Sequence, residues 1–66
     1  MRSSPLIMEF VENEGIYTGA SPSGRCWRIS RVFTGWRLEF RDHGDTAATF
    51  AGVHRSVDAA QVEAGR

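Results

Sequence analysis

Residues 26–41 alternate apolar and polar side chains, and this alternation limits the possible fold more than any other feature of the chain. The apolar members are Trp27, Ile29 and Phe33 in the first run and Trp36, Leu38 and Phe40 in the second. Successive side chains of a β-strand point to opposite faces of the sheet, so a period of two predicts two half-buried strands. Thr34-Gly35 separates the runs and provides a glycine for the positive φ of a tight turn. The sequence therefore predicts a β-hairpin over residues 25–41.

The segment after this hairpin predicts one more strand and a helix. Asp42-His43-Gly44-Asp45 has the composition of a turn, and residues 49–54 are predicted to form the third strand. Ser56 is a suitable helix N-cap and precedes an apolar stripe. The stripe consists of Val57, Ala60 and Ala64. We therefore predict the α+β class, with a three-stranded antiparallel sheet, a C-terminal helix packed on one face, and an N-terminal helix or hairpin.

The first fifteen residues are compatible with two structures. In a helix, Ser4 would be the N-cap, Pro5 the first helical residue and Gly15 the terminating residue. In a hairpin, Asn13-Glu14-Gly15 would join two short strands at residues 7–12 and 16–18. The agreement of cap, proline and glycine favours the helix. Residues 19–24 follow as a loop rich in Gly, Ser and Pro.

The length of the chain predicts a single small domain over residues 1–66, with residues 25–64 as its core and residues 1–7 as an extension. A domain of this size buries only about 60% of the surface that its unfolded chain exposes. The single cysteine, Cys26, cannot form an internal disulfide, and the residues present offer no zinc-binding spacing. No apolar run approaches the roughly 20 residues that cross a membrane. We expect a cytoplasmic protein without a membrane partner.

Few residues are candidates for catalysis. Cys26 with His43 or His54 is the only pairing of a nucleophile with a base, and it lies in no recognised motif. The turn at residues 42–45 offers too few ligands for a metal ion. The glycines of residues 19–24 are not followed by the Lys-Ser/Thr pair of a phosphate-binding loop. We therefore expect no enzymatic activity, no catalytic residue, no cofactor and no metal.

Charge is unevenly distributed along a chain whose formal net charge is zero. Residues 25–41 contain five arginines and one glutamate, a net charge of +4, whereas the segments before and after it each carry −2. With Thr34-Gly35 as the turn, Arg28 lies opposite Arg41, and like charges in that position are destabilising unless something compensates. Two interpretations stay open: a solvated face whose arginine stems cover apolar surface, and an anion-binding surface. The residues of that anion-binding surface are Arg25, Arg28, Arg37 and Arg41.

The order of strand, hairpin, strand and helix carries a resemblance. With its arginine-bearing strands and the Ala-rich stretch that starts at Ser56-Val57-Asp58, the segment from residue 25 to 64 resembles the arm-binding domains of phage-type integrases. It is likewise similar to the related plant ethylene-response DNA-binding domains. The resemblance implies that the exposed sheet face enters the major groove of DNA, and that the four arginines named above face the nucleic acid.

A second class of function is a protein-interaction module or accessory subunit. Its support is the small core, the zero net charge and acidic ends that could meet the basic hairpin of another copy in self-association. The arginines of the hairpin could equally dock on an acidic protein surface. An open sheet edge at residues 49–54 or 26–33 would invite strand pairing. The sequence thus predicts a non-enzymatic binding module, with nucleic acid as the first partner and an acidic protein surface as the alternative.

Overall fold

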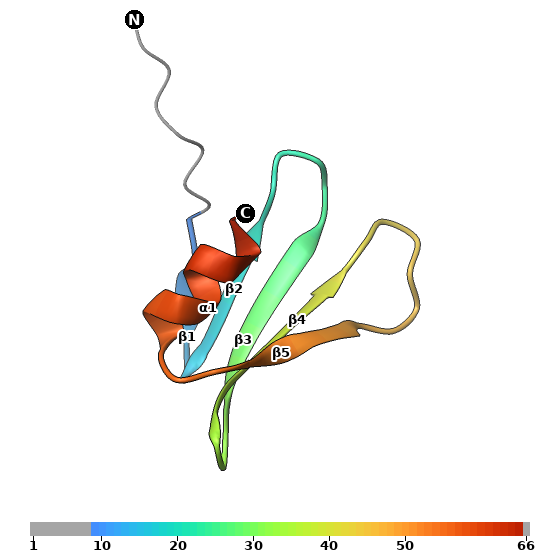
Figure 1. The fold of residues 1–66 in the computed structure, drawn as a ribbon. Helices are drawn as coiled ribbons and strands as arrows, with labels where there is room; N and C mark the ends of the chain where they lie inside the picture. Colours follow the sequence, from blue (N-terminus) through green and yellow to red (C-terminus); the bar gives the residue numbers. More distant parts are fainter. Residues whose placement is uncertain (1–8, 66) are drawn as a thin grey trace, which may run out of the picture.

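A computed structural model describes residues 9–65, which form a single antiparallel sheet and one helix (Figure 1). The elements are β1 (Val11–Asn13), β2 (Ile16–Ala20), β3 (Cys26–Val32), β4 (Gly35–Arg41), β5 (Thr49–His54) and α1 (Val57–Ala64). The strands lie in the sheet in the order β1-β2-β3-β4-β5, so each strand pairs with its neighbours in sequence. The fold is therefore a five-stranded meander followed by a short helix.

The predicted three-stranded sheet is wrong, because residues 11–20 add two further strands at its edge. The preference for an N-terminal helix is also wrong over the described residues, and the hairpin alternative holds there. Glu14 and Gly15 form its turn with φ angles of 55° and 84°, and two positive φ values in a two-residue loop match the twist of the flanking strands. Ser4, Pro5 and the predicted extension at residues 1–7 lie outside the described residues.

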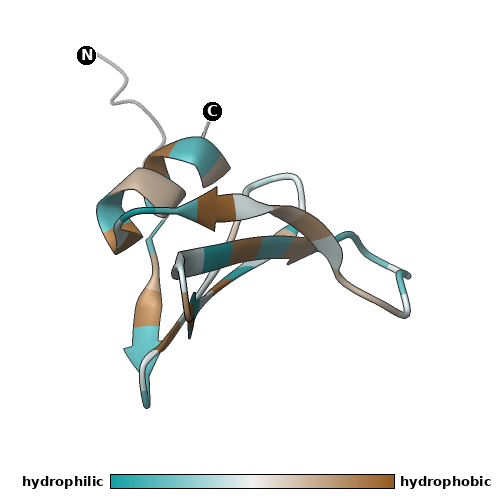
Figure 2. Ribbon diagram, turned by 60° about the horizontal axis from the view of Figure 1, so that its bottom comes forward, coloured by the Kyte–Doolittle hydropathy of each residue, from teal (hydrophilic) through white to brown (hydrophobic). Residues whose placement is uncertain are grey.

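The core lies between α1 and one face of the sheet. Ile29 and Leu38 pair across β3 and β4, and both are fully buried. Trp27, Ala60 and Ala64 complete the buried cluster, and α1 contacts β3, β4 and β5. The hydropathy colouring in Figure 2 shows apolar and polar residues alternating along the strands, as expected for a sheet with one covered face.

Several local predictions for the second half of the chain are confirmed. The strand at residues 49–54 has the predicted bounds. Ser56 caps α1, because its Oγ accepts a hydrogen bond of 3.0 Å from the backbone N–H of Ala59. The two buried residues of the helix, Ala60 and Ala64, are one turn apart, and their short side chains let α1 approach the sheet closely.

The register of the central hairpin differs from the predicted one by two residues. Its turn consists of Phe33 and Thr34, and Val32 pairs with Gly35. Gly35 is the first residue of β4 and not part of the turn. A glycine is needed there because its φ is 152° and because an added Cβ would be 2.5 Å from the carbonyl oxygen of His54 in β5. A shift of two residues keeps the paired residues of both strands on their predicted faces, since the period of a strand is two. Phe33 is the exception, because it lies in the turn and is exposed instead of facing the core.

Candidate functional site

The face of the sheet opposite α1 carries most of the candidate residues, and we call it the open face. Residues paired directly across antiparallel strands share a face, so the pairings identify its members. They are Val11, Asn13, Ile16, Thr18, Ala20, Cys26, Arg28, Ser30, Val32, Arg37, Glu39, Arg41, Phe50 and Val53. Three arginines and one glutamate give these residues a net charge of +2.

The three arginines of the open face form a zigzag across β3 and β4. Arg28 pairs with Glu39, so Arg37 and Arg41 are its two diagonal neighbours on the adjacent strand. Diagonal neighbours in an antiparallel pair lie about 7–8 Å apart at the backbone. All three arginines are exposed. The pattern places positive charge at regular intervals along the two central strands.

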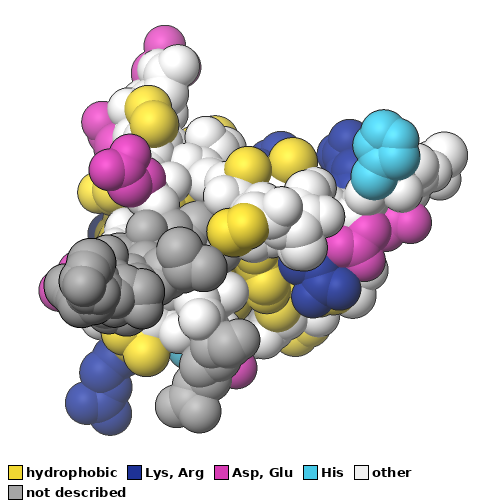
Figure 3. All heavy atoms as spheres, turned by 90° about the horizontal axis from the view of Figure 1, so that it is seen from above, with side chains coloured by type: hydrophobic (Ala, Val, Ile, Leu, Met, Phe, Trp, Pro, Cys, Tyr) yellow, Lys and Arg dark blue, Asp and Glu magenta, His cyan; other side chains and the backbone are white. Residues whose placement is uncertain are grey.

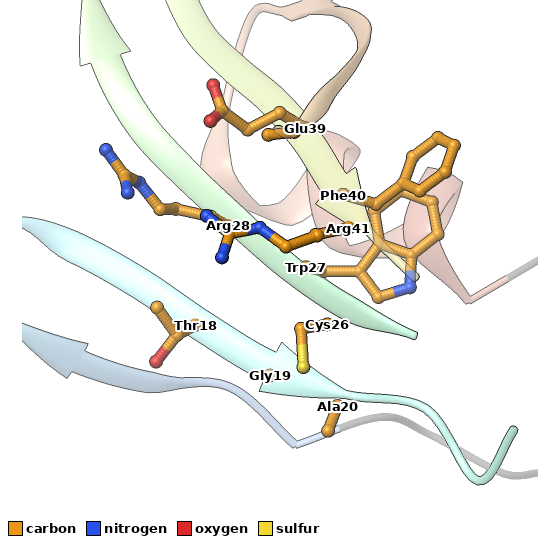
Figure 4. Close-up of a pocket in the computed structure, with 10 residues that line it drawn as sticks. Thr18, Gly19, Ala20, Cys26, Trp27, Arg28, Glu39, Phe40 and Arg41 are labelled. Atoms are coloured by element: carbon orange, nitrogen blue, oxygen red, sulfur yellow. The ribbon is translucent and has the colours of Figure 1, made fainter. Parts of the chain in front are cut away.

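A shallow depression of about 430 Å³ lies beside two of these arginines (Figure 4). Short side chains on β2 and at the start of β3 leave the space, while longer ones on β3 and β4 border it. The short residues are Thr18, Ala20 and Cys26, and the long ones are Arg28, Glu39 and Arg41. Trp27 and Phe40, which also line it, extend to the other side of the strands in Figure 4. The depression therefore belongs mainly to the open face.

The three arginines of the zigzag differ in the ion pairs and ring contacts that they form. The Nε of Arg37 forms an ion pair of 3.0 Å with Oε1 of Glu39, and its guanidinium lies 5.0 Å from the ring centre of Phe50. Within residues 9–65, Arg28 and Arg41 take part in no ion pair. The predicted opposition of Arg28 and Arg41 is wrong, because Arg28 faces Glu39. Two exposed guanidinium groups beside the depression are thus free to bind a ligand.

Arg25 does not belong to this group, although the sequence placed it there. Its guanidinium lies 3.9 Å from the ring centre of Phe40, on the helix side of the sheet, and makes two hydrogen bonds to Asp42. Their lengths are 2.7 Å from Nε to Oδ1 and 3.0 Å from Nη2 to Oδ2. The hydrogen bond from Arg25 lowers the pKa of Asp42 below its ordinary value. Arg25 therefore closes the end of the central hairpin.

Acidic and basic side chains also meet at the end of the molecule that carries the loops after β2 and β4. Viewed from that end, Figure 3 shows basic, histidine and acidic side chains next to one another on one side, and a group of acidic side chains on the other. Positive charge does not dominate this end, whereas the residues of the open face have a net charge of +2.

Of the residues considered for catalysis, Cys26 and His54 lie on opposite faces of the sheet. Cys26 lies on the open face and His54, which pairs with Trp36, lies on the helix side of the sheet. His43 is exposed in the turn after β4. In the part of the chain that the structure describes, no group of three or more His, Cys, Asp or Glu side chains could hold a metal ion.

Sequence reasoning missed the apolar part of the open face. Val11, Ile16, Phe50 and Val53 are exposed hydrophobic residues on its outer strands. Phe50 and Val53 share a face despite being three residues apart, because a β-bulge interrupts the pairing of β5 opposite Leu38 and Glu39. A bulge breaks the period of two, so alternation could not have revealed this pair.

Comparisons with known proteins give no match to any family model, to any curated protein or to any solved structure. Among residues 9–65, no helix is both long enough and apolar enough to cross a membrane. The functional argument therefore rests on the residues of the open face.

Proposed function

We propose that this protein binds nucleic acid through the open face of its sheet, with Arg28 and Arg41 as the principal phosphate contacts and Arg37 as a third. The observation that carries the proposal is the pair of exposed, unpaired guanidinium groups that border one depression. A guanidinium is planar, permanently charged and able to donate two parallel hydrogen bonds to phosphate oxygens. Thr18, which also borders the depression, adds a hydroxyl group of the kind that contacts phosphate or sugar.

The spacing of the arginines favours a polyanion over a single small anion. The zigzag repeats a positive charge at every diagonal step along β3 and β4, and a nucleic-acid strand presents phosphates at repeated intervals. Glu39 offsets Arg37 through their ion pair, so the excess charge lies toward Arg28 and Arg41. One phosphate at the depression and others along the hairpin would use all three arginines.

The distribution of apolar residues argues against a protein partner on this face. Protein interfaces usually have an apolar centre surrounded by a polar rim. On the open face the order is reversed, with arginines on the central strands β3 and β4 and exposed apolar residues on the outer strands. Phe50 and Val53 on one side and Val11 and Ile16 on the other would flank a bound phosphate backbone.

The test is the salt dependence of binding to labelled duplex DNA and to a single strand of the same sequence, measured by fluorescence anisotropy. Three phosphate contacts predict a slope of about −2.7 for log K against log salt on duplex DNA, and about −2.1 on the single strand. The double variant Arg28→Ala/Arg41→Ala should reduce the magnitude of the duplex slope to about 0.9. Arg55→Ala is the matched control, since it removes an exposed arginine outside the strands.

Two results would contradict the proposal. One is the absence of binding to either nucleic acid at low salt by a folded wild-type protein. The other is the same loss of binding free energy per removed arginine in Arg55→Ala and in the double variant, because total charge, and not the open face, would then determine affinity. All three substituted residues are exposed, so each variant should keep the fold. Urea unfolding of each variant verifies this.

A further inference from the structure

Phe33 is the most exposed large hydrophobic residue among the described residues, with a relative accessibility of 103%. It lies in the two-residue turn between β3 and β4, with Val32 and Gly35 as the last pair before it. No element of the described chain covers its ring. An aromatic side chain in this position contributes nothing to the core and is available for contact with another molecule.

The turn is presented on a projecting two-stranded ribbon. Pairing between β2 and β3 stops at Tyr17 and Ile29, so the ribbon beyond Ile29 has no neighbour on the β2 side. Figure 1 shows the tip of this hairpin extending past the other strands. The pair of Trp36 and His54, the last between β4 and β5 on this side, lies at the base of the ribbon. Phe33 is therefore carried by a supported projection.

The ribbon carries one arginine on each of its faces close to the tip. Arg37 lies on the open face, and Arg31 lies on the helix side, where its guanidinium is 5.2 Å from the ring centre of Trp36. Both side chains are exposed, and the segment from residue 30 to 36 contains no acidic residue. Along a strand these arginines are about 7–10 Å from the turn, which long side chains can span. An aromatic tip thus has a guanidinium group on each side, and that of Arg37 is also ion-paired with Glu39.

We infer that Phe33 inserts between stacked bases of the bound nucleic acid, while Arg31 and Arg37 contact phosphates on either side of the insertion. This inference rests on the proposed function, and the added contact of Arg31 would steepen the expected duplex slope from about −2.7 to about −3.6. Apolar side chains act as such wedges in grooves by partly unstacking a base step and bending the duplex. The two flanking arginines favour this occupant over an apolar pocket of a protein, which would accept Phe33 without requiring a cation on each face of the ribbon.

The test uses duplex DNA with 2-aminopurine at a flexible pyrimidine–purine step, because fluorescence of this base rises when it is unstacked. Binding of the wild-type protein should raise the fluorescence, and Phe33→Ala should abolish the rise. Loss of one base–aromatic stacking contact should also weaken binding about 5- to 150-fold, with an unchanged salt slope because the phosphate contacts remain. Phe33→Trp should keep the rise. Val62→Ala, at an exposed apolar residue of α1, is the matched control.

The outcomes separate this inference from the proposed function. Wild-type binding with a steep salt slope, and the same fluorescence rise in Phe33→Ala, would overturn the insertion of Phe33 and leave the phosphate contacts standing. Salt-dependent binding of the wild-type protein without any rise in fluorescence would also overturn the insertion of Phe33 and leave the phosphate contacts standing. Absence of wild-type binding would overturn both.

Discussion

The two hairpins of this sheet have the same topology and opposite properties. β1 and β2 pair through three residues, all residues of β1 are exposed, and Glu12 and Glu14 make the hairpin acidic. β3 and β4 pair through seven residues and supply the buried pair Ile29 and Leu38. One hairpin widens the sheet, while the other contains its core and its arginines. The difference shows that stability and the proposed binding surface reside in the same two strands.

The comparison also explains how a chain without net charge can have a basic surface. Negative charge is concentrated in the β1–β2 hairpin and the C-terminal segment, and positive charge in the β3–β4 hairpin. Exposed charges separated by more than about 8–10 Å are largely screened at physiological salt. A ligand at the depression therefore experiences mainly the charged residues that border it, Arg28, Arg41 and Glu39, which together carry a net charge of +1. Composition alone hides this separation.

The largest expected effect is on stability, when an apolar side chain is truncated in the β3–β4 hairpin and, for comparison, in the β1–β2 hairpin. Leu38→Ala should destabilise the domain by about 2–5 kcal/mol, because it removes a fully buried side chain from β4. A domain of this size has little more stability than that, so the variant should be largely unfolded. Val11→Ala in β1 should change stability by less than about 0.5 kcal/mol, since Val11 is 67% exposed.

Urea unfolding followed by tryptophan fluorescence and circular dichroism measures both variants. Similar losses of stability in Leu38→Ala and Val11→Ala would contradict the assignment of the core to the central hairpin. A fully folded Leu38→Ala would contradict the burial of β4 against α1.

Burial also determines how much of the fold could be predicted. In β3, β4 and α1, apolar residues face one common core, so their spacing in the sequence reproduces the periods of strand and helix. In β1, none of the three residues is buried, and no alternation marks the strand. The turn at Glu14-Gly15 is equally inconspicuous, because it places a glutamate where asparagine or glycine is usual. The sequence therefore favours a helix over the hairpin that the structure shows.

The candidate site was predictable by face but not by register. Assigning the turn to Thr34-Gly35 shifted β4 by two residues, which preserved the faces and changed the partner of Arg28. Gly35 is required for its close contact with β5, which the sequence does not reveal. Arg25 lies just before β3, where alternation does not fix its side, and pairing with Asp42 depends on how the turn after β4 folds.

The next effect concerns the turn of the acidic hairpin. Glu14 has a φ of 55°, a region that asparagine adopts more readily than glutamate. Glu14→Asn should therefore stabilise the protein by about 0.5–1 kcal/mol, measured as a higher urea midpoint. Glu14→Gln is the control that removes the same charge without favouring the turn, and it should leave the midpoint close to that of the wild type. Equal increases in the urea midpoint of both variants would show that removal of the negative charge, and not the backbone conformation of residue 14, causes the stabilisation.

The smallest expected effect concerns the ion pair of Arg25 and Asp42 at the end of the β3–β4 hairpin. Among the described residues, the β1–β2 hairpin has no such ion pair. Hydrogen bonding from Arg25 lowers the pKa of Asp42 in the folded state. A depressed carboxyl pKa adds stability above the unfolded value of about 3.9, and this contribution is lost as pH falls through the lower folded pKa. Asp42→Asn should be less stable than wild type at neutral pH, and the difference should vanish in acid.

Urea midpoints of the two proteins between neutral pH and about pH 2 test this expectation. The difference should be small, because both side chains of the pair are partly exposed. A difference that stays constant down to the acid end would show that the Asp42 side chain contributes through something other than its charge, since the backbone groups that bond to Asp45 are the same in both proteins.

The most direct test of the central claim, that nucleic acid occupies the open face, uses the only cysteine of the chain. Cys26 is exposed and lies in the depression beside Arg28 and Arg41. The measurement is the rate of Cys26 alkylation by iodoacetamide with and without saturating duplex DNA at low salt. The account predicts that DNA slows alkylation of the wild-type protein, and that high salt or Arg28→Ala/Arg41→Ala restores the rate. An unchanged rate, when anisotropy shows that DNA is bound, would contradict the account.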